Sequence, residues 1–185
     1  ADVIFHVAAA VHGSVSSADE FYQMNVDGTK AVIRAARLVG AKLVHVSTVN
    51  VASYRHGELT EPYAESKSLA ETAVMEAVEE GLSAVIVRPA TVFGNELGRG
   101  GLIVDRLLSG SLRVLPAGGR QISPVWSGDL ATALIRAGEV GKNGSTYTVA
   151  GEAVSTSEFI RGVCESTGLK GPLLSPSAWL FVVPL

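Results

Sequence analysis

The sequence Tyr63-Ala64-Glu65-Ser66-Lys67 contains the pattern on which the interpretation of this chain depends. Nothing around it breaks a helix, so the stretch is expected to be helical. In a helix Tyr63 and Lys67 lie one turn apart on one face, which places a phenol beside an ammonium group. A fixed positive charge lowers the pKa of a tyrosine from its usual value of about 10. The pair can then act as a general acid or base on a hydroxyl or carbonyl. An ordinary amphipathic helix face gives the same pattern, so the neighbouring segments must show whether the pair is catalytic.

Composition excludes several classes of protein. The chain has 185 residues, of which 47% are hydrophobic, enough for one domain with a sizeable core. A net charge of −3 gives no basic patch that would indicate nucleic-acid binding. The single Cys164 excludes an internal disulfide, and the four histidines lack metal-ligand spacing, so we expect no metal. No apolar run reaches the roughly 20 residues of a membrane span, and we expect no signal peptide. These features fit a cytoplasmic location.

The expected order of elements predicts an α/β fold. Apolar runs predict buried strands at 2–10, 42–48 and 82–87, the last stopped by Arg88-Pro89, and helical patterns lie between them at 19–39 and 63–80. Such alternation predicts a parallel sheet with helices on both faces. Residues 49–62 are expected to form a loop, and Gly28 to mark close packing against a strand or ligand. Shorter elements follow, with helices at 102–108, 129–137 and 155–166 and strands at 112–115, 124–126 and 146–149.

Hydroxyl groups follow the second strand. Ser47 and Thr48 stand at its carboxyl end, where doubly wound sheets bind their ligands. A hydroxyl there can hydrogen-bond the substrate oxygen that Tyr63 protonates or deprotonates. The alternative is a hydroxyl that caps the loop backbone. Small residues end the first strand and let a flat ligand lie on its backbone.

Five segments taken together resemble the extended short-chain dehydrogenase/reductase superfamily, of the NAD-dependent epimerase/dehydratase type. They are Asp2-x-Ile4-x-His6-x-Ala8-Ala9, Asn25-Val26-x-Gly28-Thr29, Val44-His45-Val46-Ser47-Thr48, Tyr63-x-x-Ser66-Lys67-x-x-Ala70-Glu71 and Val87-Arg88-Pro89-x-x-Val92-Phe93-Gly94. The resemblance implies a Rossmann-like doubly wound parallel sheet, incomplete because its first strands are lacking, with a small C-terminal α+β substrate-binding part. Residues 1–94 would belong to the dinucleotide-binding domain, and 95–185 mostly to the substrate-binding part, with the segments around 122–137 returning to the sheet.

The resemblance also implies roles for individual residues. Tyr63 would be the acid/base, and Lys67 would hold the nicotinamide ribose and lower the tyrosine pKa. Thr48 would bind the substrate, with Ser47 beside it. The cofactor, NAD or NADP, would contact these residues: Val7, Ala8, Ala9, Asn25, Val46, Ser47, Tyr63, Lys67, Pro89 and Val92.

One departure from the family pattern concerns the phosphate-binding loop. No glycine-rich turn follows the first strand, and the glycines of residues 94–101 follow the Arg88-Pro89 strand instead. We therefore expect the chain to be an internal segment, with two strand–helix units, on the order of 60 residues, preceding it in a longer protein. Alone, it is expected to fold poorly or to be inactive, because its first strand would be a bare apolar edge.

The substrate class is open among several alternatives. No Asp-Glu pair follows Thr48, which disfavours a sugar 4,6-dehydratase. The segment Ile122–Trp126 resembles the dihydroflavonol reductase and 3β-hydroxysteroid dehydrogenase branch. Trp126 and the apolar run 179–185 would suit an apolar substrate, although plain packing in the core is the favoured alternative for these residues. The leading hypothesis is an oxidoreductase that acts on a hydroxyl or ketone of a small apolar or alicyclic molecule. A nucleotide-sugar epimerase comes second, and a non-catalytic NADP-binding sensor or scaffold third. The family also implies a homodimer through the helices near 20–39 and 63–80.

Overall fold

The structure, a computed structural model, describes residues 2–11, 17–94, 109 and 121–168. The chain divides into two compact units. The first comprises Ala1–Pro89 and Asp129–Val149, and the second Ala90–Gly128 and Ala150–Leu185. The helix expected at 102–108, the strand at 112–115 and the apolar run 179–185 lie outside the described residues. Among the described helices, none has the length and apolar character needed to cross a membrane.

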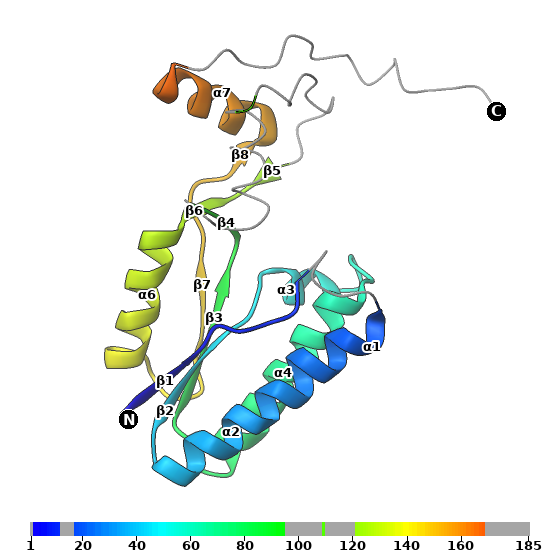
Figure 1. The fold of residues 1–185 in the computed structure, drawn as a ribbon, viewed down its shortest axis with the longest axis vertical. Helices are drawn as coiled ribbons and strands as arrows, with labels where there is room; N and C mark the ends of the chain where they lie inside the picture. The colour runs from blue at the N-terminus through cyan, green and yellow to red at the C-terminus, as the bar shows by residue number, and fades with distance from the viewer. Residues whose placement is uncertain (1, 12–16, 95–108, 110–120, 169–185) are drawn as a thin grey trace, which may run out of the picture. The chain divides into compact units, whose positions relative to one another are not determined.

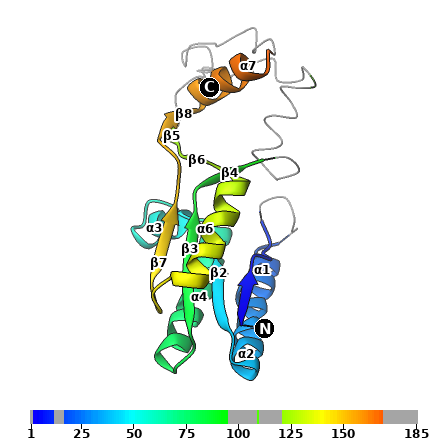
Figure 2. The ribbon, with the colours of Figure 1, turned by 90° about the vertical axis from the view of Figure 1, so that its left-hand side faces the viewer.

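A parallel sheet forms the centre of the first unit. Its strands are β1 (Val3–His6), β2 (Lys42–Val46), β3 (Ala84–Pro89) and β7 (Thr146–Val149), in the order β1-β2-β3-β7. All three pairings are parallel, so the carboxyl ends of the strands share one edge of the sheet. Figure 2 shows the strands side by side in this order. The expectation of a parallel sheet is confirmed.

Helices cover both faces of this sheet (Figure 1). On one face lie α2 (Gly28–Val39) and α4 (Pro62–Glu79), and on the other α6 (Ser127–Val140). Each face of the sheet has its own hydrophobic core. Successive side chains of a strand point to opposite faces, so they contribute in turn to the two cores. Leu43 packs with the α2 and α4 side chains, whereas Val44 packs with Leu134 of α6. The doubly wound arrangement is therefore confirmed for the first unit.

Local signals explain where these helices begin and end. α2 ends at Gly40, which has a φ of 65° in the left-handed region that glycine adopts without strain. α4 begins with Pro62 after the extended Glu61, because proline at the first helical position gives up no hydrogen bond. Before α2 come α1 (Ala18–Phe21) and η1 (Tyr22–Asp27), which is a π-helix.

Several boundaries differ from the expected ones. The first strand stops at His6, because the following residues turn away to meet the helix layer. β3 runs through Pro89, whose carbonyl still accepts a hydrogen bond from the Val49 N–H. The expected loop 49–62 contains a helix, α3 (Asn50–Arg55). Gly28 does not mark close packing against a strand, since a Cβ there would meet no heavy atom within 4 Å, and packing against a ligand stays a prediction. Its N–H instead bonds to the Gln23 carbonyl at the end of the π-helix.

The described residues of the second unit form short strands and the helix α7 (Thr156–Thr167). β4 (Thr91–Phe93) pairs in parallel with β6 (Pro124–Trp126), and β5 (Gln121–Ile122) pairs antiparallel with β8 (Val154–Ser155). α7 starts with a complete capping box between Ser155 and Glu158, which confirms the expected helix start.

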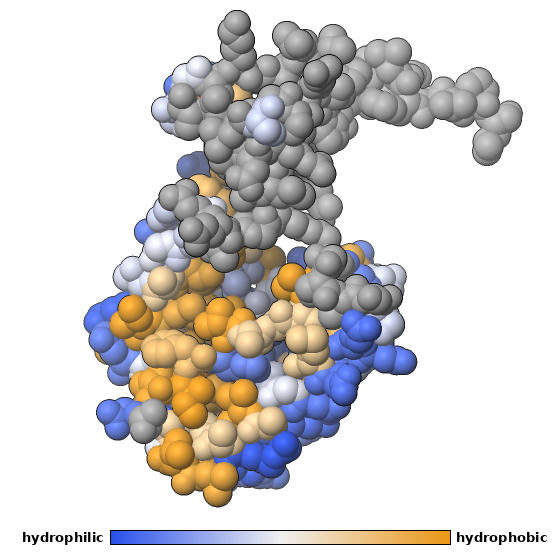
Figure 3. Space-filling view, in the orientation of Figure 1, coloured by the Kyte–Doolittle hydropathy of each residue, from blue (hydrophilic) through white to orange (hydrophobic). Residues whose placement is uncertain are grey.

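Apolar side chains gather on one face of the first unit, whereas the α2 side is largely hydrophilic (Figure 3). The exposed apolar residues include Phe5 and Val7, and Ile135 and Val140 of α6. Among the described residues β1 pairs with β2 alone, so its other edge lies at the border of the sheet, as expected.

Candidate active site

The side chain of Lys67 is the most constrained part of the predicted site. It is 2% exposed, and its Nζ donates a 2.7 Å hydrogen bond to the Val46 carbonyl at the carboxyl end of β2. Burial lowers the pKa of this amine to about 8, against a smaller opposing effect from Glu71. Tyr63 is half-buried one turn earlier on α4, and its ring lies 5.9 Å from that of Phe21. The helix therefore presents the pair to the edge where parallel strands end.

Asn25 connects three segments of the site. Its side chain is 1% exposed and accepts a 2.7 Å hydrogen bond from the Ala10 N–H. Its Nδ2 donates to the Ala10 carbonyl at 3.1 Å and to Ser66 Oγ at 3.0 Å, and Ser66 Oγ donates to the Tyr63 carbonyl at 2.8 Å. The π-helix η1 carries Asn25, and π-bulges often occur at functional sites. Asn25 thus ties the segment after β1 to the turn of α4 that carries the pair.

Ser47 and Thr48 follow β2 at the same edge. The Ser47 N–H donates to the Val87 carbonyl at 2.7 Å, which holds this segment against β3. Its Oγ is buried and has no hydrogen-bond partner among the described residues. Thr48 Oγ1 accepts a 3.3 Å hydrogen bond from the Asn50 N–H, as in the backbone-capping alternative. The Thr48 hydroxyl hydrogen can still be donated, so capping and substrate binding are compatible.

The other predicted cofactor contacts divide between the two units. Val7 is 57% exposed, Ala8 is exposed and Ala9 half-buried, just beyond β1. Pro89 is buried at the end of β3, where it pairs with Val149. Val92 belongs to the second unit, where it pairs with Val125. The first unit therefore holds all the predicted site residues except Val92.

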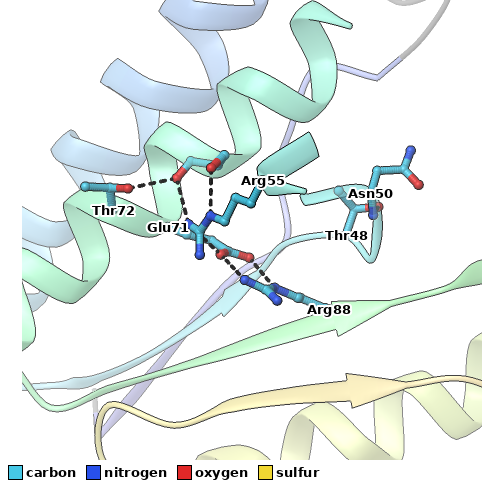
Figure 4. A network of polar contacts seen from close by, with 7 residues as sticks. Thr48, Asn50, Arg55, Glu71, Thr72 and Arg88 are labelled. Atoms are coloured by element: carbon cyan, nitrogen blue, oxygen red, sulfur yellow. Dashed lines mark hydrogen bonds and ion pairs between the residues drawn. The ribbon is translucent and has the colours of Figure 1, made fainter. Parts of the chain in front are cut away.

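A buried ion-pair network anchors α4 to β3 (Figure 4). Glu71, 1% exposed, accepts hydrogen bonds from Arg88 Nε at 2.8 Å and from Arg88 Nη2 at 2.6 Å. Arg55 of α3 lies 3.1 Å from the same carboxylate, and its Nε donates to Ser68 Oγ at 3.0 Å. The network joins the helix that carries Tyr63 and Lys67 to the segment that carries Thr48.

Two buried histidines, which the sequence did not single out, feel the charge of Lys67, since burial and then that charge lower the pKa of both. His6 and His45 are register partners on β1 and β2, and their rings lie 5.3 Å apart. In the sequence, each histidine follows a short apolar run that predicts a strand, and this was the pattern that could have indicated their pairing. Among the described residues, no three His, Cys, Asp or Glu side chains are placed to bind a metal ion.

A comparison with family profiles assigns the chain. Residues 1–150 match the profile described as "NAD dependent epimerase/dehydratase family". The chain belongs to this family.

Several curated proteins match much of the chain. A dTDP-4-dehydrorhamnose reductase of Mycobacterium tuberculosis is 34% identical over 90% of this chain and 60% of its own length. A 4-hydroxy-2-methyl-3-oxo-4-farnesyl-3,4-dihydroquinoline-1-oxide ketoreductase of Stigmatella aurantiaca is 27% identical over 99% of this chain and 63% of its own length. Sterol demethylase protein B of Methylococcus capsulatus is 27% identical over 93% and 57%. The chain thus spans about 60% of the length of these relatives.

Solved structures support the same assignment. A dTDP-glucose 4,6-dehydratase of Streptomyces venezuelae, solved with NAD bound, superposes with a TM-score of 0.75 and 26% identity. The match covers 91% of this chain and 58% of the dehydratase.

The residues of the first unit fit the nicotinamide–ribose half of the family's dinucleotide. The buried Lys67 ammonium uses one of its three protons on Val46, and two remain for a ligand's hydroxyl groups. The Ser47 hydroxyl, which no described residue binds, and the exposed, small Ala8 leave a polar group and open backbone at the same sheet edge. Ligands of open α/β sheets bind at this edge.

Proposed function

We propose that the protein is an NAD(P)-dependent oxidoreductase that interconverts a hydroxyl and a ketone through Tyr63, Lys67 and Thr48. The observation that carries the proposal is the buried Lys67 ammonium, held on the Val46 carbonyl one helical turn after Tyr63. A cation held there favours the phenolate form of the neighbouring tyrosine. The family assignment supports the same chemistry.

Each residue has one role in this proposal. When bound, the nicotinamide supplies or accepts the hydride. In reduction, Tyr63 donates its hydroxyl proton to the ketone oxygen, and Lys67 stabilises the phenolate that remains. Thr48 donates a hydrogen bond to the same oxygen. Asn25 and the Glu71–Arg88 ion pair hold the segments that carry these groups.

The leading substrate class is a small apolar or alicyclic ketone. Three half-exposed or exposed aromatic rings cluster in the second unit: Phe93 lies 5.5 Å from Trp126 and 5.3 Å from Phe159. Aromatic faces suit apolar ligands. The name of the Stigmatella relative points in the same direction. A nucleotide sugar is the second candidate, supported by the name of the mycobacterial relative.

A tyrosine replacement tests the catalytic role. In the full-length protein, Tyr63→Phe should lower turnover about 100-fold or more and leave NAD(P)H affinity unchanged, because the acid/base is lost while the binding surface stays. The matched control is Tyr22→Phe, which removes a neighbouring hydroxyl that donates to Glu65 at 2.8 Å. Equal turnover in the wild type and Tyr63→Phe would refute the catalytic role of Tyr63, and NAD(P)H binding without any turnover in the wild type would support a cofactor-binding sensor. The homodimer through the helices near 20–39 and 63–80 and the cytoplasmic location stay predictions.

A further inference from the structure

The short helix α3 begins shortly after Thr48, the residue proposed to bind the substrate oxygen. The Thr48 carbonyl accepts a hydrogen bond from the Val51 N–H at 3.3 Å, and its Oγ1 accepts one from the Asn50 N–H at 3.3 Å. The first turn of α3 therefore restricts the direction in which the Thr48 hydroxyl can donate its own hydrogen. A movement of α3 is transmitted to the hydroxyl that the proposed reaction uses.

The helix α3 is too short to be stable by itself. It has six residues, Asn50–Arg55, whereas isolated helices of fewer than about 12 residues are marginal in water. Among its residues, only Val51 is buried. Contacts between its polar side chains and the rest of the unit must therefore contribute to holding α3 in place.

Polar side chains of α3 reach the segment that carries the proposed acid/base. Asn50 Nδ2 donates a 3.3 Å hydrogen bond to Oε1 of Glu61, the residue just before α4. Desolvation, the Glu65 charge and a hydrogen bond to Glu65 raise the pKa of Tyr54, one turn later on α3. These side chains are all half-buried, and partly exposed polar contacts of this kind contribute little individually.

Arg55, the last residue of α3, extends into the buried polar layer of α4 (Figure 4). Its Nε donates to Ser68 Oγ at 3.0 Å, its Nη2 donates to the Ser68 carbonyl at 3.3 Å, and Nη2 lies 3.1 Å from the Glu71 carboxylate. Ser68 is 7% exposed and Glu71 is 1% exposed. Arg88 already neutralises the Glu71 charge with two hydrogen bonds, so the charge of Glu71 does not require a second arginine. The bonds to Ser68 give the Arg55 guanidinium a fixed direction, as a simple ion pair would not.

We propose that Arg55 is a positioning residue, which fastens α3 to α4 and so sets the place of the Thr48 hydroxyl relative to Tyr63. This inference rests on the proposed function. The ketone oxygen must meet both hydroxyl groups at once, and these groups come from different segments of the chain. A displacement of about 1 Å at a reacting centre can cost about 100-fold in rate. Arg55 acts through Thr48 and has no role of its own in the proton transfer.

An activity-independent experiment measures the Thr48 side chain directly. In the full-length protein, the three-bond NMR couplings of the Thr48 methyl carbon to the backbone nitrogen and carbonyl carbon report its χ1 rotamer. We expect one rotamer in the wild type and an averaged one in Arg55→Met, which removes the guanidinium but keeps an extended side chain. The matched control is Arg37→Met. The Arg37 side chain is 41% exposed, against 43% for Arg55, and it bonds to the Ala77 carbonyl near the other end of α4. An unchanged Thr48 rotamer in Arg55→Met would overturn the inference.

A double-mutant cycle tests whether the effect on turnover passes through Thr48. We expect Arg55→Met to lower kcat about tenfold in the otherwise wild-type protein and to leave NAD(P)H affinity unchanged, with Arg37→Met behaving as the wild type. In a Thr48→Val background, which lacks the hydroxyl, Arg55→Met should lower kcat by about twofold or less. The same tenfold loss in both backgrounds would overturn the inference, because Arg55 would then act independently of Thr48.

Ser68→Ala is the second variant should Arg55→Met fail to fold. It removes the oxygen that accepts the Arg55 Nε–H and leaves the arginine in place. We expect partial averaging of the Thr48 rotamer and a kcat lowered about threefold, a smaller effect because the other Arg55 contacts stay. No change in either would overturn the inference. A wild type without oxidoreductase activity would remove the proposed function but leave the effect of Arg55 on the Thr48 rotamer measurable, so the two failures are distinguishable.

Discussion

Replacing Glu71 with Gln should destabilise the protein more than any comparable change at an exposed ion pair. The Glu71 carboxylate is 1% exposed and pairs with two arginines. Glu71→Gln preserves the shape of the side chain but leaves Arg88 next to a neutral amide. Removing one partner of a buried ion pair costs about 3–5 kcal/mol. The Arg88 and Arg55 side chains are 18% and 43% exposed and can reach water, so we expect the lower limit, about 3 kcal/mol.

The assay is urea unfolding of the full-length protein, with the unfolding midpoint and slope fitted for each variant. The matched control is Glu80→Gln, which removes the same charge from the ion pair between Glu80 and Arg37. The Arg37 side chain is 41% exposed and that of Glu80 is 66% exposed. Exposed pairs contribute about 0–1 kcal/mol, so the control should be nearly neutral. Equal losses in free energy of unfolding for the two variants would refute the claim that the buried network anchors α4 to β3.

Three further predictions concern other parts of the fold. Asn25→Ala removes the side chain that binds the buried N–H and carbonyl of Ala10. It should therefore lower the free energy of unfolding by about 2–4 kcal/mol in the same urea assay. The control Gln23→Ala, on the exposed side of η1, should change the free energy of unfolding little. The pKa of His45 is lowered in the folded state, so the unfolded chain binds more protons below about pH 6.5. Stability should therefore fall with decreasing pH, by up to about 1.4 kcal/mol per pH unit, and less in His45→Gln; equal slopes would contradict a neutral buried His45. Ser155→Ala removes the N-cap of α7, so amide hydrogen exchange in its first turn should speed up about fivefold while the α4 amides are unaffected.

Elements with strong local signals could be predicted from the sequence. α4 combines a proline start with an uninterrupted run of helix formers, and α7 has both halves of its capping box, so local chemistry determines where each begins. The first three strands are apolar runs separated by helices, a pattern that few folds other than a parallel sheet satisfy.

Features that depend on tertiary contacts could not be predicted. α3 is held by Arg55, which reaches Glu71 and Ser68 on another helix, so the sequence 49–62 alone resembles a loop. β5 and β8 are two residues each and pair across a long stretch of sequence, which leaves no periodic pattern to detect. The contacts of Asn25 with Ala10 and Ser66 depend on the π-helix, for which the sequence carries no established signal.

Transfer of deuterium from the cofactor tests the central claim most directly. The full-length protein is incubated with NADH or NADPH deuterated at the reactive C4 position and a panel of apolar ketones and nucleotide-sugar ketones, and the products are analysed by mass spectrometry. The account predicts one deuterium on the new carbinol carbon, and at least about 100-fold less of this product from Tyr63→Phe under the same conditions. Formation of an epimerised or dehydrated product that carries no deuterium from the added cofactor would contradict the proposed reductase, because those reactions return the substrate's own hydride.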